Sequence, residues 1–336
     1  MKQKEEGLKR EVGVFGLSAN IVNIVVGAGI FVIPAIVTQK MGSTSIVAYL
    51  VCGVLIALIM LCFAEIGSKV TNTGGSFAYI EEAFGNYPGF IAAIVSVAAG
   101  VMADAAIANA LIDILATSFD FFNLEAVRVS FFLVVFFGLG AVNIIGVKQG
   151  IGLVKTITLI KLTPLFILII FGFKDININN LYWEASPTIK QIGETSLILI
   201  FAFQGAESGL VIGGEIKNPK KTVPKAIFLS ILSILIIYIL IQTVTQGVMG
   251  IELANFKEAP LAATADVIFG PIGYTLLFIG AAVSMFGFLT GEILNNPRVL
   301  FASARDKVLP IKQLERIHPK FKTPYIAILT YVSIGF

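Results

Sequence analysis

Charged residues and histidine are scarce in this chain of 336 residues. Only 13% of the residues are Asp, Glu, Lys or Arg, whereas soluble domains carry about 25%. The one histidine, His318, excludes multi-histidine metal sites and leaves most acid–base chemistries without a partner. Cys52 and Cys62 lie in one apolar segment, which favours core packing over a redox or metal role. Hydrolase motifs such as Gly-x-Ser-x-Gly and His-Glu-x-x-His are also absent, so the sequence predicts neither an enzyme nor a cofactor.

Apolar residues, in contrast, are abundant. They make up 57% of the chain, and the mean hydropathy is +0.91. A soluble fold of this length cannot bury so much apolar surface, so lipid is the expected solvent. The apolar runs are continuous rather than alternating, which predicts membrane-spanning helices and not a barrel.

Eight spans and the start of a ninth follow from runs long enough to cross a bilayer. They are predicted at 13–38, 45–67, 89–117, 129–147, 152–173, 192–213, 226–250 and 267–301, with the ninth opening near Thr323. The chain stops at Phe336 within an apolar run, which predicts a truncation in span nine.

The orientation follows from lysine and arginine, which concentrate on the cytoplasmic side of membrane proteins. With the N-terminus in the cytoplasm, most basic residues fall inside, including those of the N-terminal tail, 217–225 and 305–322. The N-terminal stretch has no cleavable apolar core. The prediction is a multi-pass protein of the cell membrane with a cytoplasmic N-terminus.

Two spans contain glycine-rich interruptions. Gly27-Ala28-Gly29 lies in the first span, and Gln204-Gly205-Ala206-Glu207 lies in the sixth. Close helix packing through small residues is one explanation. The interruptions are five spans apart, however, and breaks in corresponding helices of two inverted halves indicate a binding site at the membrane midplane. Unwound backbone there exposes N–H groups for an anion and carbonyls for a cation, as a zwitterion requires.

Four motifs occur in order along the chain. They are Gly27-Ala28-Gly29-Ile30-Phe31, Thr73-Gly74-Gly75-Ser76-Phe77-Ala78-Tyr79, Phe201 to Glu207 with Glu215-Ile216-Lys217-Asn218-Pro219, and Pro297-Arg298 with Ala304-Arg305-Asp306. In these motifs the sequence resembles the amino acid–polyamine–organocation (APC) superfamily of amino acid permeases. The resemblance implies an all-α polytopic membrane protein with a LeuT-like five-plus-five inverted repeat and broken helices one and six. On that scheme, residues 1–12 are a cytoplasmic tail, 13–173 are the first repeat (spans 1–5), and 192–336 are an incomplete second repeat (spans 6–9).

The resemblance also implies a substrate site at the two breaks, made of Val25, Ala28, Gly29, Phe201, Gln204 and Gly205. Amides around Ala28 and Gly29 would receive the substrate carboxylate. Carbonyls near Val25, Phe201 and Gln204 would receive its ammonium group, and Phe201 would cover the bound molecule.

Ionisable side chains within spans are functional candidates, because each costs about 2.5–3.5 kcal/mol at a helix centre. In the family a basic residue at the position of Lys161 can replace a coupling sodium ion, which implies sodium-independent transport. The alternatives are that Lys161 pairs with a carboxylate or extends to the membrane surface. Glu207 follows the second break and is either a proton-responsive gate or a support for the unwound segment.

Two carboxylates, Asp104 in span three and Glu292 in span eight, resemble side-chain-pocket positions of the family. Both would favour a cationic substrate side chain such as that of lysine, arginine or ornithine. The alternative is that they pair with Lys161 or Arg298, or face another helix. At the cytoplasmic side, an ion pair between Arg305 and Asp306 at an inner gate is one hypothesis, and residues 215–225 are expected to form a solvated turn.

The predicted function is therefore secondary active transport of amino acids by alternating access, sodium-independent, with proton coupling left open and a preference for cationic amino acids. A polyamine or neutral amino acid substrate, a channel and a non-transporting sensor remain alternatives. The expected partners are a small amino acid or amine, coupling protons and membrane lipid. Nucleic acid is not expected, because the basic residues lie in short loops and form no single basic face.

Overall fold

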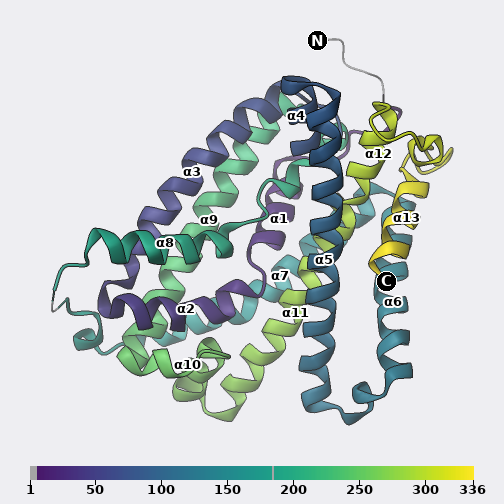
Figure 1. Cartoon of the computed structure of the whole chain (residues 1–336). Helices are drawn as coiled ribbons and strands as arrows, with labels where there is room; N and C mark the ends of the chain where they lie inside the picture. Colours follow the sequence, from purple (N-terminus) through teal and green to yellow (C-terminus); the bar gives the residue numbers. More distant parts are fainter. Residues whose placement is uncertain (1–5, 184) are drawn as a thin grey trace.

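The computed structural model describes residues 6–183 and 185–336, and most of this part is helical. Its one β feature in those ranges is an isolated parallel bridge between Val12 and Ile216. Figure 1 shows the helices as one bundle, with the N-terminal segment and the α12–α13 connection at the same end. That end is called the N-terminal face below.

Six long helices form the body of the bundle. They are α3 (Ser45–Lys69), α5 (Asn86–Ser118), α6 (Glu125–Ile145), α7 (Val147–Gly172), α9 (Pro219–Met249) and α11 (Pro271–Asn295). Within the described residues, six helical stretches containing these elements are long and apolar enough to cross a membrane. The helices expose many large apolar side chains, among them Leu58 and Leu61 on α3 and Val134 on α6, as expected of lipid-facing helices.

The first and sixth predicted spans are each interrupted. The first consists of α1 (Val14–Val25) and α2 (Gly29–Met41), and the sixth begins with α8 (Ile189–Phe203) and continues as the short 3₁₀ turns η5 (Ser208–Leu210) and η6 (Gly213–Glu215). In Figure 1, α2 and α8 run across the bundle, whereas α5 and α6 run along it. The interruptions lie where the sequence predicts them; the inverted repeat itself stays a prediction.

Four shorter helices complete the bundle, of which α13 begins close to the predicted opening of span nine near Thr323. These are α4 (Ser76–Phe84), α10 (Pro260–Phe269), α12 (Pro297–Arg305) and α13 (Tyr325–Gly335). The predicted span over 267–301 corresponds to one helical stretch over Pro271–Arg305, but the prediction begins a few residues too early and misses a break at Pro297. Gly270 has φ +68°, a conformation that favours glycine, and Pro271 starts a new helix there. At the other end, Pro297 has no N–H with which to continue the backbone hydrogen bonds of α11.

The main apolar core surrounds α1, which packs against α7, α9 and α11. A second core joins α5, α6 and α13 through residues such as Leu111, Phe136 and Tyr331. Because α1 is enclosed on several sides, the backbone groups freed where it ends must find partners inside the protein and not in lipid.

Candidate functional site

A cavity of about 650 Å³ lies where the two interrupted spans meet. Its walls come from the α1–α2 break, the end of α8, one face of α5 and the α11–α12 region. Of the predicted site residues it is lined by Val25, Ala28, Gly29, Phe201, Gln204, Gly205, Glu207 and Glu292. Asp104 and Lys161 are not among its lining residues.

The first break places the start of a helix at the cavity. α1 ends at Val25, Val26 leaves the helical conformation with ψ 67°, and α2 begins at Gly29 without a side-chain cap. The first N–H groups of a helix have no acceptor within the helix, and the helix dipole adds partial positive charge there. The start of α2 therefore has the unpaired donors that an anionic group needs; binding of the substrate carboxylate at Ala28 and Gly29 stays a prediction.

The second break depends on Gly205. After Phe203 the chain becomes extended at Gln204, and Gly205 has φ +98°. A Cβ atom at Gly205 would approach Cγ2 of Ile24 to 2.6 Å, so any larger residue would push the two breaks apart. Phe201 lines the cavity and is 69% exposed; its predicted role as a cover stays a prediction.

Lys161 is fully buried beside the end of α1. Its ammonium group donates to the carbonyl oxygens of Asn23 at 2.5 Å and Val26 at 2.6 Å. It makes no ion pair among the described residues, so pairing with Asp104 or Glu292 is excluded in this conformation. A cation thus occupies the negative end of the α1 dipole.

Two other hydroxyl groups at this site were not predicted. Tyr238 on α9 donates towards the carbonyls of Val25 at 3.0 Å and Ala202 at 2.8 Å, and Ser284 on α11 donates to that of Val26 at 2.9 Å. Tyr238 therefore connects the two helix ends. The only signal in the sequence is a lone polar residue within an apolar span, which does not reveal what it will contact.

The two candidate carboxylates lie at different depths. Glu292 is on the cavity wall, and its Oε2 accepts from the Asn296 amide at 2.6 Å. Asp104 is fully buried behind the wall and accepts from the Tyr331 hydroxyl at 2.7 Å. Arg298, the other predicted partner, binds elsewhere, so neither carboxylate has a basic partner among the described residues.

Arg298 forms a buried ion pair with Glu215. The guanidinium Nε and Nη2 atoms lie 2.5 and 3.0 Å from the two carboxylate oxygens, and both side chains are 0% exposed. The predicted solvated turn is therefore wrong at Glu215. Sequence reasoning missed the pair because its members are 83 positions apart.

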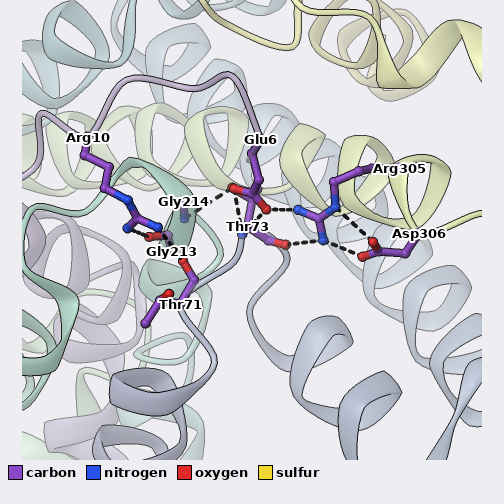
Figure 2. Close-up of polar contacts among 8 residues, drawn as sticks. All are labelled: Glu6, Arg10, Thr71, Thr73, Gly213, Gly214, Arg305 and Asp306. Carbon is purple, nitrogen blue, oxygen red and sulfur yellow. Dashed lines mark hydrogen bonds and ion pairs between the residues drawn. The ribbon is translucent and has the colours of Figure 1, made fainter. Parts of the chain in front are cut away.

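A second polar cluster closes the N-terminal face (Figure 2). Arg305 pairs with Asp306, as predicted, and also with Glu6. Glu6 accepts from the Thr73 backbone N–H at 2.9 Å and from the Thr73 hydroxyl at 2.8 Å. The Thr73 hydroxyl in turn accepts from the Gly214 N–H at 3.2 Å. The cluster joins the N-terminal segment, the α3–α4 loop, the end of span six and α12.

Arg10 extends this closure. Its guanidinium donates to the carbonyls of Gly213, Ile216 and Thr71 at 3.2, 2.9 and 3.3 Å. Backbone bonds from Val12 to Glu215 and from Lys217 to Val12 continue the contact. Partial burial lowers the pKa of Arg10. Residues 6–12 therefore form a strap across this face, called the N-terminal strap below.

No group of three His, Cys, Asp or Glu side chains that could hold a metal ion occurs in residues 6–183 and 185–336. The breaks instead offer backbone groups and carboxylates, which suit a small zwitterion.

Comparison with known proteins places the chain in a family. The model of the amino acid permease family matches residues 12–336. The serine/threonine exchanger SteT of Bacillus subtilis is 32% identical over 346 residues, which cover all of this chain and 77% of SteT. The mouse large neutral amino acids transporter small subunit 2 is 26% identical; the match covers 96% of this chain and 63% of that protein.

Solved structures support the fold. The chain is similar to a sodium-coupled sialic acid symporter, with TM-score 0.63 and 12% identity over 97% of this chain and 72% of the other. It is also similar to the nucleobase-cation-symport-1 transporter Mhp1, with TM-score 0.66 and 15% identity over 99% and 73% of the two chains. Both are membrane transporters with a LeuT-type fold. By its family match and its relatives, which are transporters and not enzymes, the chain belongs to the amino acid permease family of the APC superfamily.

Proposed function

We propose that this protein transports amino acids across a membrane by alternating access, with the cavity at the two helix breaks as its binding site. The observation that carries the proposal is the meeting of a helix start at Ala28–Gly29 with helix ends at Val25 and Phe203 around one cavity. These termini supply partial charges of both signs at fixed positions. An α-amino acid presents a carboxylate and an ammonium group on one carbon and matches that pair.

Transport is proposed to need no sodium ion. The Lys161 ammonium already neutralises the end of α1 by donating to two carbonyl oxygens. A metal cation bound to the same oxygens would meet a like charge at short range, which is unfavourable in a low-dielectric interior.

A cationic substrate side chain is favoured by the charge of the cavity. Glu292 reaches the wall without a basic partner among the described residues, and Glu207 lines the same cavity. Buried carboxylates are normally paired, and a lysine or ornithine side chain would supply the missing charge.

A second candidate is the exchange of small neutral amino acids. It is favoured by the relative at 32% identity, whose name is serine/threonine exchanger. In that case Glu292 and Asp104 act within the protein, and the substrate side chain is neutral.

The mechanism is proposed to use the N-terminal strap as the inner closure, with the N-terminal face in the cytoplasm. Glu6, Arg305 and Thr73 link three segments on one side of the cavity, and the bond from the Gly214 N–H to Thr73 adds the end of span six. Opening towards the cytoplasm requires these bonds to break. Coupling to protons would act through Glu207 or Lys161.

The test is uptake by the protein reconstituted in liposomes. Labelled lysine, ornithine, serine, threonine and leucine are compared with choline in place of sodium, with and without internal amino acid, and with and without an inward proton gradient. We expect sodium-free uptake, with lysine and ornithine above leucine. Glu292→Gln should lower the lysine-to-leucine ratio about 10-fold, since it removes a charged partner, whereas Glu82→Gln, at an exposed position on α4, should not.

Preference for serine and threonine, unchanged in Glu292→Gln, would support the second candidate. Strict sodium dependence would contradict the role given to Lys161. Absence of any uptake by a folded preparation would favour a sensor.

A further inference from the structure

Four polar side chains form a continuous hydrogen-bonded chain from the cavity wall to α13. The Asn296 amide donates to Glu292 Oε2 at 2.6 Å and to the Tyr331 hydroxyl at 3.0 Å. Tyr331 donates to Asp104 Oδ2 at 2.7 Å. Glu292 and Asn296 line the cavity, whereas Asp104 and Tyr331 are 0% exposed. The chain thus connects α11, α13 and α5 behind the wall.

The donors and acceptors fix the direction of each of these hydrogen bonds. An amide nitrogen can only donate, so the Tyr331 oxygen must accept from Asn296. The single hydroxyl proton of Tyr331 is then directed to Asp104. A hydrogen bond to a carboxylate is shorter and stronger than one between neutral groups. Asp104 therefore anchors Tyr331, and Tyr331 anchors the Asn296 amide that binds Glu292.

Gly100 leaves space for these hydrogen-bonded side chains. It lies one helical turn before Asp104 on α5. A Cβ atom there would come within 2.9 Å of the Tyr331 hydroxyl and would overlap the Asn296 amide. The absence of a side chain at Gly100 is what allows two polar groups from different helices to meet against α5.

Asp104 is only partly hydrogen-bonded, which is unfavourable for a residue that serves only to pack helices together. Its Oδ1 is buried and has no partner in the part of the chain that the structure describes. A half-satisfied buried carboxylate costs stability, and an apolar contact between α5 and α13 would avoid that cost. The presence of a carboxylate at this cost points to a use for the hydrogen bond that it accepts.

We propose that Asp104, Tyr331 and Asn296 are positioning residues that hold the Glu292 carboxylate towards the cavity and thereby set the selectivity for cationic substrates. Tyr331 acts on selectivity without touching the substrate. The inference rests on the proposed function, in which Glu292 receives the cationic side chain. It assigns charge recognition to Glu292 and gives Asp104 the role of a hydrogen-bond acceptor.

The test compares KM and kcat for ornithine and serine in liposomes, and stabilisation of the detergent-solubilised protein by each amino acid against heat. Tyr331→Phe removes one hydroxyl and keeps the ring. It should raise KM for ornithine about 10-fold, the effect of losing one hydrogen bond to a charged group. The kcat for either substrate and the KM for serine should not change. Tyr49→Phe is the matched control, because the Tyr49 hydroxyl is buried without a partner in the described residues; it should change neither KM.

Two substitutions of Asp104 distinguish the effect of its hydrogen bond from the effect of its charge. Asp104→Asn keeps an oxygen that accepts a weaker bond from Tyr331 and should raise KM for ornithine less than Asp104→Ala, which should behave like Tyr331→Phe. Equal damage by Asp104→Asn and Asp104→Ala would overturn the inference, since it would show that charge and not the hydrogen bond matters. Equal changes for ornithine and serine in Tyr331→Phe would also overturn it, because they would indicate a general loss of packing.

The proposed function and the positioning role can be contradicted independently of each other. If Glu292→Gln leaves the ornithine-to-serine ratio unchanged, cation recognition by Glu292 is wrong. A clear effect of Glu292→Gln with none of Tyr331→Phe overturns the positioning role alone.

Discussion

Replacement of Lys161 tests the role of a buried cation at the end of α1. Lys161→Ala removes the ammonium group that donates to the carbonyls of Asn23 and Val26. Ser284 still donates to Val26, so Asn23 loses more. A buried acceptor left without its donor costs about 1–3 kcal/mol. Removing the charge also removes its desolvation cost, so the overall free energy of unfolding should change less than the local geometry.

The expected transport defect is large. Weakening of both carbonyl contacts, with the larger loss at Asn23, disfavours the observed arrangement of the break by about 3 kcal/mol. That corresponds to a roughly 100-fold loss of the binding-competent population. Amino acid uptake should therefore fall about 100-fold, while expression and elution as a folded protein are kept.

The assay is initial uptake in liposomes at matched protein content, together with thermal unfolding in detergent. Lys161→Gln retains one donor group and should be intermediate. Lys148→Ala, at an exposed position on the same helix, should transport normally. Wild-type uptake by Lys161→Ala would refute the assignment of Lys161 to the break.

Two further predictions concern the polar contacts near the N-terminal face. Glu215→Gln leaves the fully buried Arg298 without a counter-charge and should destabilise the protein by about 3 kcal/mol, measured as a fall in Tm, with part of the loss recovered in Arg298→Met/Glu215→Leu; an unchanged Tm would contradict the importance of the pair. Glu6→Gln keeps an acceptor for Thr73 but removes the charge opposite Arg305. Loss of an ion pair worth about 1 kcal/mol should raise the population of molecules open at this face about 5-fold. The readout is thiol labelling of Ser76→Cys, at the cavity wall, in a Cys52→Ser/Cys62→Ser background, and an unchanged labelling rate would rule out the strap as a closure.

Much of the helical framework could be predicted from local sequence. Runs of apolar residues predicted α3, α5, α6, α7 and α9 because a helix in lipid satisfies its own backbone. The predicted helix boundaries are wrong where short glycine and proline signals were overlooked. Gly270-Pro271 and Pro297 divide a long apolar stretch into α10, α11 and α12, and a hydropathy window averages over such short signals.

The backbone part of the candidate site was also predictable. Glycines at Gly27, Gly29 and Gly205 are costly in a helix, and their recurrence five spans apart indicated two breaks in one site. The cavity at both breaks agrees with this, although the identity of the substrate and the roles of these residues in binding remain proposals.

The partners of the charged residues could not be derived in this way. From the sequence, Lys161 was compatible with a carboxylate partner, Asp104 and Glu292 with basic partners, and Glu215 with solvent. In the folded chain Lys161 binds carbonyls, Glu215 pairs with Arg298, and Asp104 binds Tyr331. Composition and periodicity report which residues avoid water, because burial depends on each residue type and its neighbours along the helix. Which polar group meets which depends on the packing of helices distant in sequence, and only the folded arrangement decides it.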